Sequence, residues 1–432
     1  MSTDSIEFAG DIRIDKLSIQ SVDGTEFSII NQIVAIQIFE DLFSPFITGS
    51  IIIKDSMDLI NTVPIIGQEL LNIDISTPSL KDKGGRINTQ FFMYRIKNRE
   101  YLGDKTVMYE LDFISKEAIV DSNTKLSKRY KGKISDIAAT IMSDQEVQFD
   151  NSKKVLIEET YNDTVYISNY WSPIKNMNYL ASQAINKDKS PSYIFFENRD
   201  GFNFVTLNSL VTSPTVVQEF NYNSFTRQIT RINALRAIEM DFKRVHTISV
   251  RDGVNTLNRI HDGFMGSLLI TTDITTKTYD EKYHNALVGF TAAKHLNQYP
   301  LVSSKFPISP GAKIIVEPKA AQTFIGYQDF TNTDILQQRL YEIHEKNDFV
   351  LNIVVAGRLD YTVGQLVKLD TVKVRPIKKS ESNDEIKDKI YSGQYIITAI
   401  NHYITRKSHE CNMEIAKDSY IKDFSQDSGG VQ

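Results

Sequence analysis

The 432-residue sequence contains a single cysteine, Cys411, and one tryptophan. One cysteine excludes an intrachain disulfide and any zinc cluster built from several cysteines. The surrounding Glu-Cys-Asn-Met-Glu-Ile segment alternates polar with apolar residues, which predicts a thiol buried in a strand and not a reactive nucleophile. Such a composition fits a protein that is made and assembled in a reducing cytoplasm.

Long hydrophobic segments and an excess of positive charge are also absent. The densest apolar runs, Ile51–Ile53 and Val350–Ala356, are far shorter than the roughly 18 residues of a membrane span, so we expect no membrane insertion. The acidic segment Met1–Asp15 has no apolar run, which argues against a secretory signal peptide. Lysine and arginine total 49 against 54 acidic residues, a net charge of −5. We therefore expect no specific nucleic-acid binding.

Signatures of catalytic and metal sites are missing as well. The sequence has no GxSxG, GxxxxGK or GxGxxG motif and no HExxH spacing. The seven histidines are His246, His261, His284, His295, His344, His402 and His409. His402 and His409 can meet at the end of a predicted hairpin, but they lack an obvious third ligand, so we interpret them as surface polar residues. We predict no catalytic, cofactor-binding or metal-binding residue, and no cofactor.

Two charge patterns leave alternatives open. A glycosidase-like pair of carboxylates is compatible with the many acidic residues, because partners in space need not be close along the chain. Solvated surface charge is the simpler interpretation. The densest basic run consists of Lys125, Lys128, Arg129, Lys131 and Lys133. We interpret it as solvated, or as paired with an acidic face of a partner, in preference to a phosphate site.

The composition that is present, 41% hydrophobic and 24% charged, is typical of a folded globular protein. The length predicts three or four domains. Period-2 alternation predicts strands in the first 115 residues. They cover 12–19, Ile33–Phe39, Ile47–Ile53, Leu70–Ile75, Gln90–Ile96 and Val107–Phe113. A short helix, Met57–Thr62, is expected between them, capped by Asp55 or Ser56 and stopped by Pro64.

The middle of the chain changes to helical spacing. Ile134, Ile137 and Ile141 lie on one face of a predicted helix. A second helix is predicted over Pro173–Lys187, with Ser172 as N-cap and proline at the first helical position. It is followed by a hairpin that turns at Asn198–Gly201.

The remaining third is predicted to be mostly strands. We expect strands at Ala237–Val250, Ser267–Thr276, Phe349–Ala356, Gln365–Val374, Tyr395–Tyr403 and Cys411–Ala416. A helix at Val254–His261 is assigned Asp252 as its cap, and a helix at Asp334–Lys346 is assigned Thr333. Lys378–Lys389 is a long polar insertion.

These patterns predict an α+β, β-dominated fold with two tube-like antiparallel β-barrel domains, one α+β domain and one smaller β-rich domain. The predicted bounds are 1–116 for the first barrel, 117–218 for the α+β domain, 219–250 plus 331–420 for the second barrel, 251–330 for the β-rich accessory domain and 421–432 for a disordered tail.

The two strand-rich ends match each other in order. The corresponding pairs are Ile66–Leu70 with Val363–Val367, Phe91–Ile96 with Tyr395–Ile400, and Leu111–Ser115 with Met413–Lys417. In each copy Gly-Gln opens a strand, and a polar loop precedes the next one. We infer an internal duplication. Three copies of a chain with two like domains can form a ring with pseudo-sixfold symmetry.

Two segments resemble a known family. Phe39–Ser50 with its continuation to Gln68, and Trp171-Ser172-Pro173 with the helix and hairpin up to Phe202, are similar to the baseplate central hub protein of contractile-tailed bacteriophages, which is related to the hub part of type VI secretion spike proteins. The resemblance covers most of the chain up to about 210 and returns from about 333 to 420. The insertion Lys378–Lys389 departs from it.

The resemblance implies a non-enzymatic homotrimer in the virion tail baseplate, assembled in the host bacterial cytoplasm. Two tube-like domains per chain would form a pseudo-hexameric ring that joins the sixfold tail tube to the threefold central spike, with baseplate wedge proteins at its periphery. Because no β-helical repeat follows residue 420, a separate spike subunit is implied. The alternatives are a tail-associated cell-wall hydrolase or carbohydrate-binding protein, and a hexameric tube or wedge component.

Overall fold

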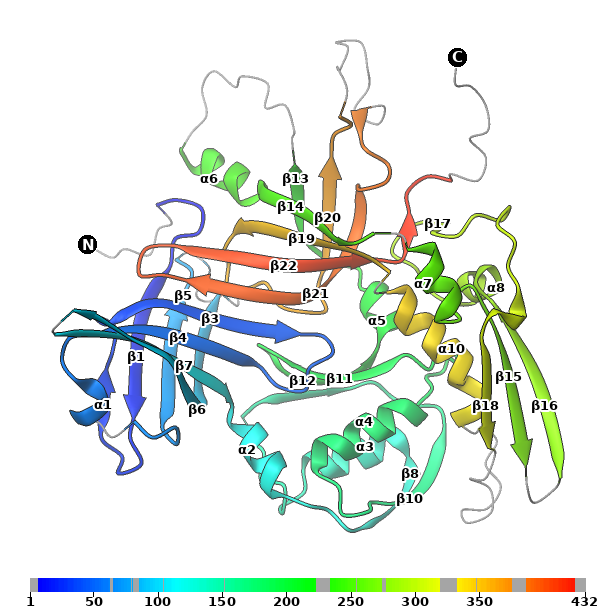
Figure 1. Ribbon diagram of the computed structural model, residues 1–432, viewed down its shortest axis with the longest axis horizontal. Coiled ribbons are helices and arrows are strands. Elements are labelled where there is room, and N and C mark those ends of the chain that lie inside the picture. The colour runs from blue at the N-terminus through cyan, green and yellow to red at the C-terminus, as the bar shows by residue number, and fades with distance from the viewer. Residues whose placement is uncertain are drawn as a thin grey trace.

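Strands dominate the computed structural model, and the predicted α+β, β-rich fold class is confirmed (Figure 1). The structure describes residues 7–62, 65–78, 80, 85–103, 105–150, 152–222, 234–253, 255–273, 277–318, 332–346, 348–374 and 386–423. None of the helices in these ranges is long and apolar enough to span a membrane.

The first β unit holds seven strands and confirms the strands predicted for this part of the chain. Its elements are β1 (Arg13–Gln20), β2 (Glu26–Ser28), β3 (Ile33–Asp41), β4 (Thr48–Asp55), α1 (Leu59–Thr62), β5 (Leu70–Ser76), β6 (Arg86–Gly103) and β7 (Thr106–Ser115). The Asp55 carboxylate accepts hydrogen bonds from the backbone N–H groups of Met57 and Leu59, as expected of a capping residue, but the helix begins at Leu59 and not at the predicted Met57. The expected stop at Pro64 lies outside the described residues.

The second β unit is built from the last third of the chain and one earlier segment. Its elements are β13 (Val216–Tyr222), α6 (Ala234–Phe242), β14 (Val245–Asp252), α10 (Asn332–Glu345), β19 (Phe349–Ala356), β20 (Leu366–Thr371), β21 (Gly393–Ile404) and β22 (His409–Lys417). The strand predicted over Ala237–Val250 is wrong in its first half, which is helix α6. The Ala-Leu-Arg-Ala sequence there favours a helix, and β14 begins only after the turn at Lys243-Arg244.

The α+β unit lies between the two β units along the chain. Its elements are α2 (Lys116–Asn123), β8 (Arg129–Lys133), α3 (Ile134–Met142), β9 (Lys154–Ile157), β10 (Asp163–Ile167), α4 (Pro173–Gln183), β11 (Tyr193–Asn198), β12 (Gly201–Thr206) and α5 (Leu207–Val211). The Ser172 hydroxyl accepts from the Lys175 N–H at 3.4 Å, and Pro173 begins α4, as predicted. The helix ends at Gln183, short of the predicted Lys187.

A small accessory unit lies at the far side of the molecule from the first β unit (Figure 1). Its elements are α7 (Thr256–His261), β15 (Gly266–Asp273), β16 (Thr278–Asn285), α8 (Ala286–Ala292), β17 (Tyr299–Pro300), η2 (Pro310–Ala312), β18 (Ile314–Pro318) and β23 (Ser419–Tyr420). The predicted cap of α7 is wrong. Asn255 accepts from the Asn258 N–H, whereas Asp252 belongs to β14.

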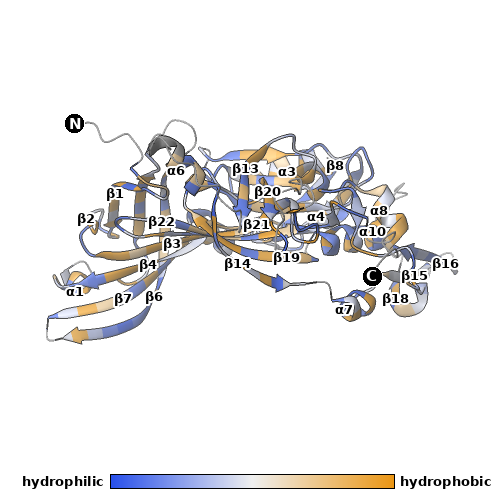
Figure 2. Cartoon of the chain, turned by 90° about the horizontal axis from the view of Figure 1, so that it is seen from above, coloured by the Kyte–Doolittle hydropathy of each residue, from blue (hydrophilic) through white to orange (hydrophobic). Residues whose placement is uncertain are grey.

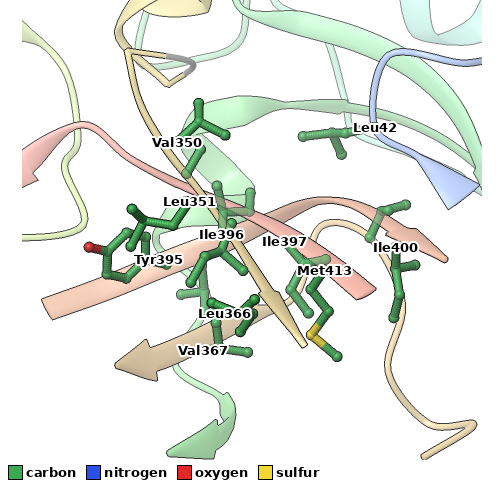
Figure 3. Packing of buried hydrophobic residues seen from close by; sticks show 14 of the residues in the cluster. Leu42, Val350, Leu351, Leu366, Val367, Tyr395, Ile396, Ile397, Ile400 and Met413 are labelled. Atoms are coloured by element: carbon green, nitrogen blue, oxygen red, sulfur yellow. The ribbon is translucent and has the colours of Figure 1, made fainter. Parts of the chain in front are cut away.

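Buried apolar side chains form four clusters in the described residues, and each β unit has one. The cluster of the second β unit packs strands β19 to β22 together (Figure 3) and also takes in Leu42, which follows β3. Figure 2 places β6 and β7 at one extremity of the molecule and the β15–β16–β18 sheet at the other. The residue bounds of the domains stay a prediction.

Besides Pro64, three expectations fall on residues that the structure does not describe. The Thr333 side chain, most of the insertion Lys378–Lys389 and the tail from residue 424 belong to this group.

Candidate assembly interface

The two β units repeat one strand order. The first unit runs β3-β4-β7-β6-β5, the second runs β14-β19-β22-β21-β20, and every neighbouring pair in both series is antiparallel. The repeat ends there, because β5 continues into β1 as an antiparallel neighbour whereas β20 pairs with β13 in parallel. The internal match predicted from the sequence is confirmed as a structural repeat.

The register agrees around one bulge that both units share, although β6 has two further bulges, at Lys97/Glu100 and Tyr101/Gly103, that β21 lacks. In the first unit a β-bulge lies between Met93 and Arg95, which face Phe113 and Asp112. In the second unit the bulge lies between Ile397 and Ala399, which face Ile415 and Glu414. Because a bulge adds one unpaired residue at a fixed place, its recurrence aligns the two copies without ambiguity.

A second bulge repeats at the start of the first strand in each series. It lies between Ile33 and Ala35 in β3, and between Val245 and Thr247 in β14. Through their partners in β4 and β19, Ile36 of the first unit therefore corresponds to Ile248 of the second.

Within the chain the two units are joined by β21 and β3. Six antiparallel residue pairs connect them, from Ala399–Asp41 to Ile404–Ile36, so both units belong to one continuous sheet. Next to the Ala399–Asp41 pair, the Leu42 N–H donates to the Thr398 carbonyl at 2.8 Å. The junction is thus an intrachain strand pairing between two copies of the same fold.

The side chain of Glu40 lies buried at this junction. Its carboxylate accepts from the Thr362 hydroxyl and from the Val363 N–H. Burial raises the pKa of Glu40 to about 7, although Thr362 and the Arg199 guanidinium act in the opposite direction. The junction therefore contains a carboxyl group that titrates near neutral pH.

The equivalents of the two joined strands are open at the same edges. β14 corresponds to β3 and ends the sheet. Among the described residues no strand pairs with its outer edge, and the isolated bridge between Asn221 and Arg244 lies just before β14 begins. β6 corresponds to β21, and its second half, from Arg95 to Gly103, pairs with β7 on one side and with no described strand on the other. Unpaired strand edges are templates for pairing with another chain.

Large apolar side chains are exposed along both open edges. Tyr101 is 72% exposed and Val250 is 47% exposed, and Leu102 of β6 is exposed too. We call the outer edge of β14 and the Arg95–Gly103 half of β6 the open edges. Exposed apolar residues on unpaired edges are typical of surfaces that a partner covers.

The α+β unit is tied to the first unit by a buried ion-pair cluster. Lys153 Nζ lies 2.6 Å from Glu117 and 2.5 Å from Glu197, and Glu197 also accepts from the Ile47 N–H. Burial raises the pKa of Glu197, and the positive charge of Lys153 counteracts it. The tip of the β11–β12 hairpin reaches the second unit, where Arg199 donates to the Leu359 carbonyl.

The structure corrects the interpretation of two histidines. His402 and His409 meet as expected, but both are buried, and Cys411 contacts both rings. The prediction of surface positions is therefore wrong, whereas the predicted strand-buried thiol is confirmed. The sequence signal for this cluster was the alternation along β22, which places Cys411 two positions from His409; the structure adds the pairing of His402 with Cys411.

The other histidines do not cluster with these two. His246, His261 and His344 are exposed. The His284 ring packs against the Tyr341 ring at a tilt of 51°, and burial lowers the pKa of His284 to about 4. His295 lies 3.5 Å from Glu345 and from Asp418, and Asp418 is already paired with Lys346.

The basic run is partly neutralised within the chain. Lys128 lies 2.8 Å from Asp144 and 3.1 Å from Glu146, and Lys133 lies 2.7 Å from Glu159. Its cations therefore serve, at least at these two positions, as surface ion pairs of the α+β unit.

A hollow of about 420 Å³ on the joined sheet is lined by carboxylates from both units. Glu40 is held by Thr362 and Val363, and Glu414 is paired with Arg251 and accepts from Thr398. These carboxylates have structural partners at the junction. The prediction of no catalytic residue stays a prediction.

Comparisons with known proteins identify the fold. No protein-family model and no curated sequence matches the chain. Two solved structures match almost end to end. A tail protein from Neisseria meningitidis MC58 is 10% identical, with 93% of this chain and 96% of that chain covered and a TM-score of 0.53. The 43 kDa tail protein of prophage MuSo2 from Shewanella oneidensis is 10% identical, with 94% and 98% covered and a TM-score of 0.52. At this identity the likeness establishes a shared fold.

Proposed function

We propose that the chain is a structural protein of a phage tail, and that it forms the homotrimeric hub of a baseplate. The ring of three chains joins a sixfold tail tube on one face to a threefold central spike on the other, with wedge proteins at its periphery. The protein acts through interface geometry and is not an enzyme. The fold shared with two tail proteins supports the tail assignment.

One observation supports the ring most strongly: the strands that are equivalent to the two strands of the intrachain junction have open edges. β21 pairs with β3 inside the chain, and the equivalent strands β6 and β14 are both open. If β6 of one chain pairs with β14 of the next, every unit meets its neighbour through the same kind of strand pairing. Three chains then supply six units, and a head-to-tail contact of this kind closes into a ring when the rotation fits.

The repeat also sets the register of the proposed contact. Through their partners in β7 and β22, Tyr101 corresponds to Ile404 and Glu100 corresponds to Tyr403. Because Ile404 faces Ile36 and Tyr403 faces Gln37, Tyr101 should face Ile248 of the next chain, and Glu100 should face Ser249. The α+β unit and the accessory unit then brace the ring from outside.

A cysteine pair tests this register. Directly opposed residues of antiparallel strands have Cα atoms about 4.5–5.5 Å apart, a separation that a disulfide can span. Glu100 and Ser249 are both exposed, and the native Cys411 is buried. Oxidation of the Glu100→Cys, Ser249→Cys double variant should yield covalent rings of three chains on a denaturing gel.

The control pairs Glu100→Cys with Asp163→Cys, an exposed site in the α+β unit, and should stay monomeric on the gel. Native mass spectrometry of the unmodified 49.2 kDa chain, alone and with tail-tube protein, should give trimers. A chain that is monomeric under both conditions contradicts the proposal. A ring of six chains supports a tube or wedge component, and clearing of peptidoglycan by the isolated chain supports a hydrolase.

A further inference from the structure

Two histidines and the single cysteine form a compact buried trio in the second β unit. His402 Nδ1 lies 3.0 Å from His409 Nε2, and Cys411 Sγ lies 3.4 Å from the first nitrogen and 3.5 Å from the second. All three side chains are at most 1% exposed. Three soft or borderline donor atoms thus converge on one point in the interior.

The hairpin of β21 and β22 creates this arrangement. His402 is paired directly with Cys411, and His409 is paired with Ile404, so the two residues of β22 lie on the same face two positions apart. The turn is fixed by Thr405 and Ser408, whose backbone groups are hydrogen-bonded. All three donors therefore come from one rigid supersecondary element.

The triangle of donor atoms has the size that a tetrahedral ion requires. With metal–nitrogen distances of about 2.0–2.1 Å and a metal–sulfur distance of about 2.3 Å, tetrahedral angles place the nitrogens roughly 3.3 Å apart and each nitrogen roughly 3.6 Å from sulfur. The observed separations of 3.0, 3.4 and 3.5 Å need only shifts of a few tenths of an ångström.

The structural repeat indicates that the fold itself does not require these donors. Through the aligned registers of β7 and β22, Val107 takes the place of His409 in the first unit, and Tyr109 takes the place of Cys411. The same hairpin thus forms around residues that make no donor cluster. Because burying polar groups costs stability unless they are paired, the trio calls for a compensating interaction.

The interactions among the three residues do not compensate fully. His402 Nε2 and His409 Nδ1 are buried and have no hydrogen-bond partner in the described part of the chain. The Cys411 sulfur lies 3.4–3.9 Å from its three polar neighbours, and a thiol is only a weak hydrogen-bond donor and acceptor. Glu40 Oε1, the free oxygen of a buried carboxylate that acts electrostatically on Cys411, has no described partner either.

We propose that His402, His409 and Cys411 bind one divalent zinc ion, with Cys411 as the thiolate. Zinc suits imidazole nitrogen and thiolate sulfur together. Binding replaces the thiol proton by the metal, so one proton leaves the site for each ion bound. The sequence argument predicted no metal because it lacked a third ligand, and Cys411 is that ligand.

The ion would hold β21 to β22 next to the strand that joins the two units. β21 pairs with β3 over the same residues, His402 with Ile38. His409 is enclosed as well, because its backbone N–H donates to the Gly10 carbonyl and its ring lies so close to Gly357 that a Cβ there would come within 2.2 Å. Such a site is loaded when the protein folds.

The test uses the full chain without an affinity tag, expressed in medium with zinc or with cobalt. Elemental analysis should give about one metal ion per chain. The cobalt-loaded protein should show a sulfur-to-cobalt charge-transfer band and strong visible bands, which require thiolate ligation and tetrahedral geometry. These two readouts need no substitution, so they stand even if a variant fails to fold.

Variants locate the site. Cys411→Ala and His409→Asn should lower the bound metal to below a tenth of an equivalent and abolish the charge-transfer band. The exposed His246→Asn is the matched control and should keep both. Folded wild-type chain without metal after growth in zinc overturns the proposal. Metal that is retained by Cys411→Ala but lost from His295→Asn also overturns the proposal, because that result assigns the ion to the group of His295, Glu345 and Asp418.

Discussion

Gly67 and Gly364 occupy the same place in the two β units, each with positive φ, 88° and 85°. The turn before β5 is fixed by the Glu69 carboxylate, which accepts from the N–H groups of Ile66 and Gly67. The turn before β20 is fixed by Gln365, whose side-chain oxygen accepts from the Thr362 N–H. The repeat therefore extends to backbone conformation, whereas the side chain that fixes each turn comes from a different position relative to the glycine: with the two glycines aligned, Glu69 aligns with Leu366, and Gln365 aligns with Gln68.

Replacing either glycine by alanine should destabilise the protein by about 1 kcal/mol, because an L-residue is strained in this region. Gly67→Ala should cost slightly more, since its Cβ would lie 3.3 Å from the Tyr94 carbonyl oxygen. Urea unfolding measures both. Gly311→Ala, where no positive φ occurs and the nearest atom is 3.9 Å away, should be close to neutral; equal losses at all three positions would contradict the argument.

Glu40 should make stability fall as the pH rises. Its pKa is raised from 4.5 to about 7 by burial, so the folded state binds this proton more tightly than the unfolded chain. The contribution is complete below about pH 4.5 and is lost as the pH rises to 7, with a size on the order of 3 kcal/mol.

The variant Glu40→Gln should therefore have a flatter profile of unfolding free energy between pH 4.5 and 7 than the wild type. Gln keeps an oxygen that can accept from Thr362 and Val363. The exposed Glu410→Gln should follow the wild-type profile. Identical slopes for wild type and Glu40→Gln would show that the Glu40 carboxyl does not titrate as burial predicts.

A charge swap at the open edges should change assembly without changing the fold. Ser249→Asp would face Glu100 of the next chain and weaken each junction by about 0.5–1 kcal/mol, whereas Ser249→Lys would not. Because a ring of three contains three such junctions, sedimentation should detect a clear loss of trimer. Adding Glu100→Lys to Ser249→Asp should restore it. If Asp and Lys at position 249 behave alike, the proposed register is wrong.

Lys153 should be essential to the stability of the buried ion-pair cluster that ties the α+β unit to the first β unit. Lys153→Met leaves Glu117 and Glu197 buried without their cation, which should cost roughly 3–5 kcal/mol at pH 7. The loss should become smaller as the pH falls, because burial raises the pKa of Glu197 and protonation of this carboxyl removes one of the two buried negative charges.

The triple variant Lys153→Met, Glu117→Gln, Glu197→Gln tests the cause of that loss. It removes the charges together and should recover much of the stability in denaturant unfolding. A triple variant as unstable as Lys153→Met would assign the loss to packing of the lysine stem.

Sequence reasoning predicted local structure and the internal repeat well, but it predicted no pairing between distant strands. The cap Ser172, the helix α4 and the hairpin β11–β12 depend on neighbouring residues, so local signals sufficed. The parallel contacts of β13 with β20 and of β9 with β12 join distant segments and leave no local signature. The prediction at α6 was wrong because its apolar residues were interpreted as a strand, although residues that favour a helix dominate the segment.

The candidate interface was predictable in part. The Gly-Gln correspondence located the repeat, and the bulges later fixed its register. The junction of β21 with β3 was not predictable, because neither strand has a sequence feature that specifies which distant strand it pairs with. The burial of His402 and His409 was within reach of sequence reasoning, since Cys411 lies two positions from His409 in an alternating strand.

The covalent link between the two units makes part of the proposed ring independent of protein concentration. In a ring of three such chains, half of the strand junctions form within a chain, so dilution does not weaken them. Only three encounters are needed to close six units. The two kinds of unit also alternate, so an insertion carried by one of them, such as the segment between β20 and β21, recurs three times around the ring. One face can thus present six similar contacts while the other presents three.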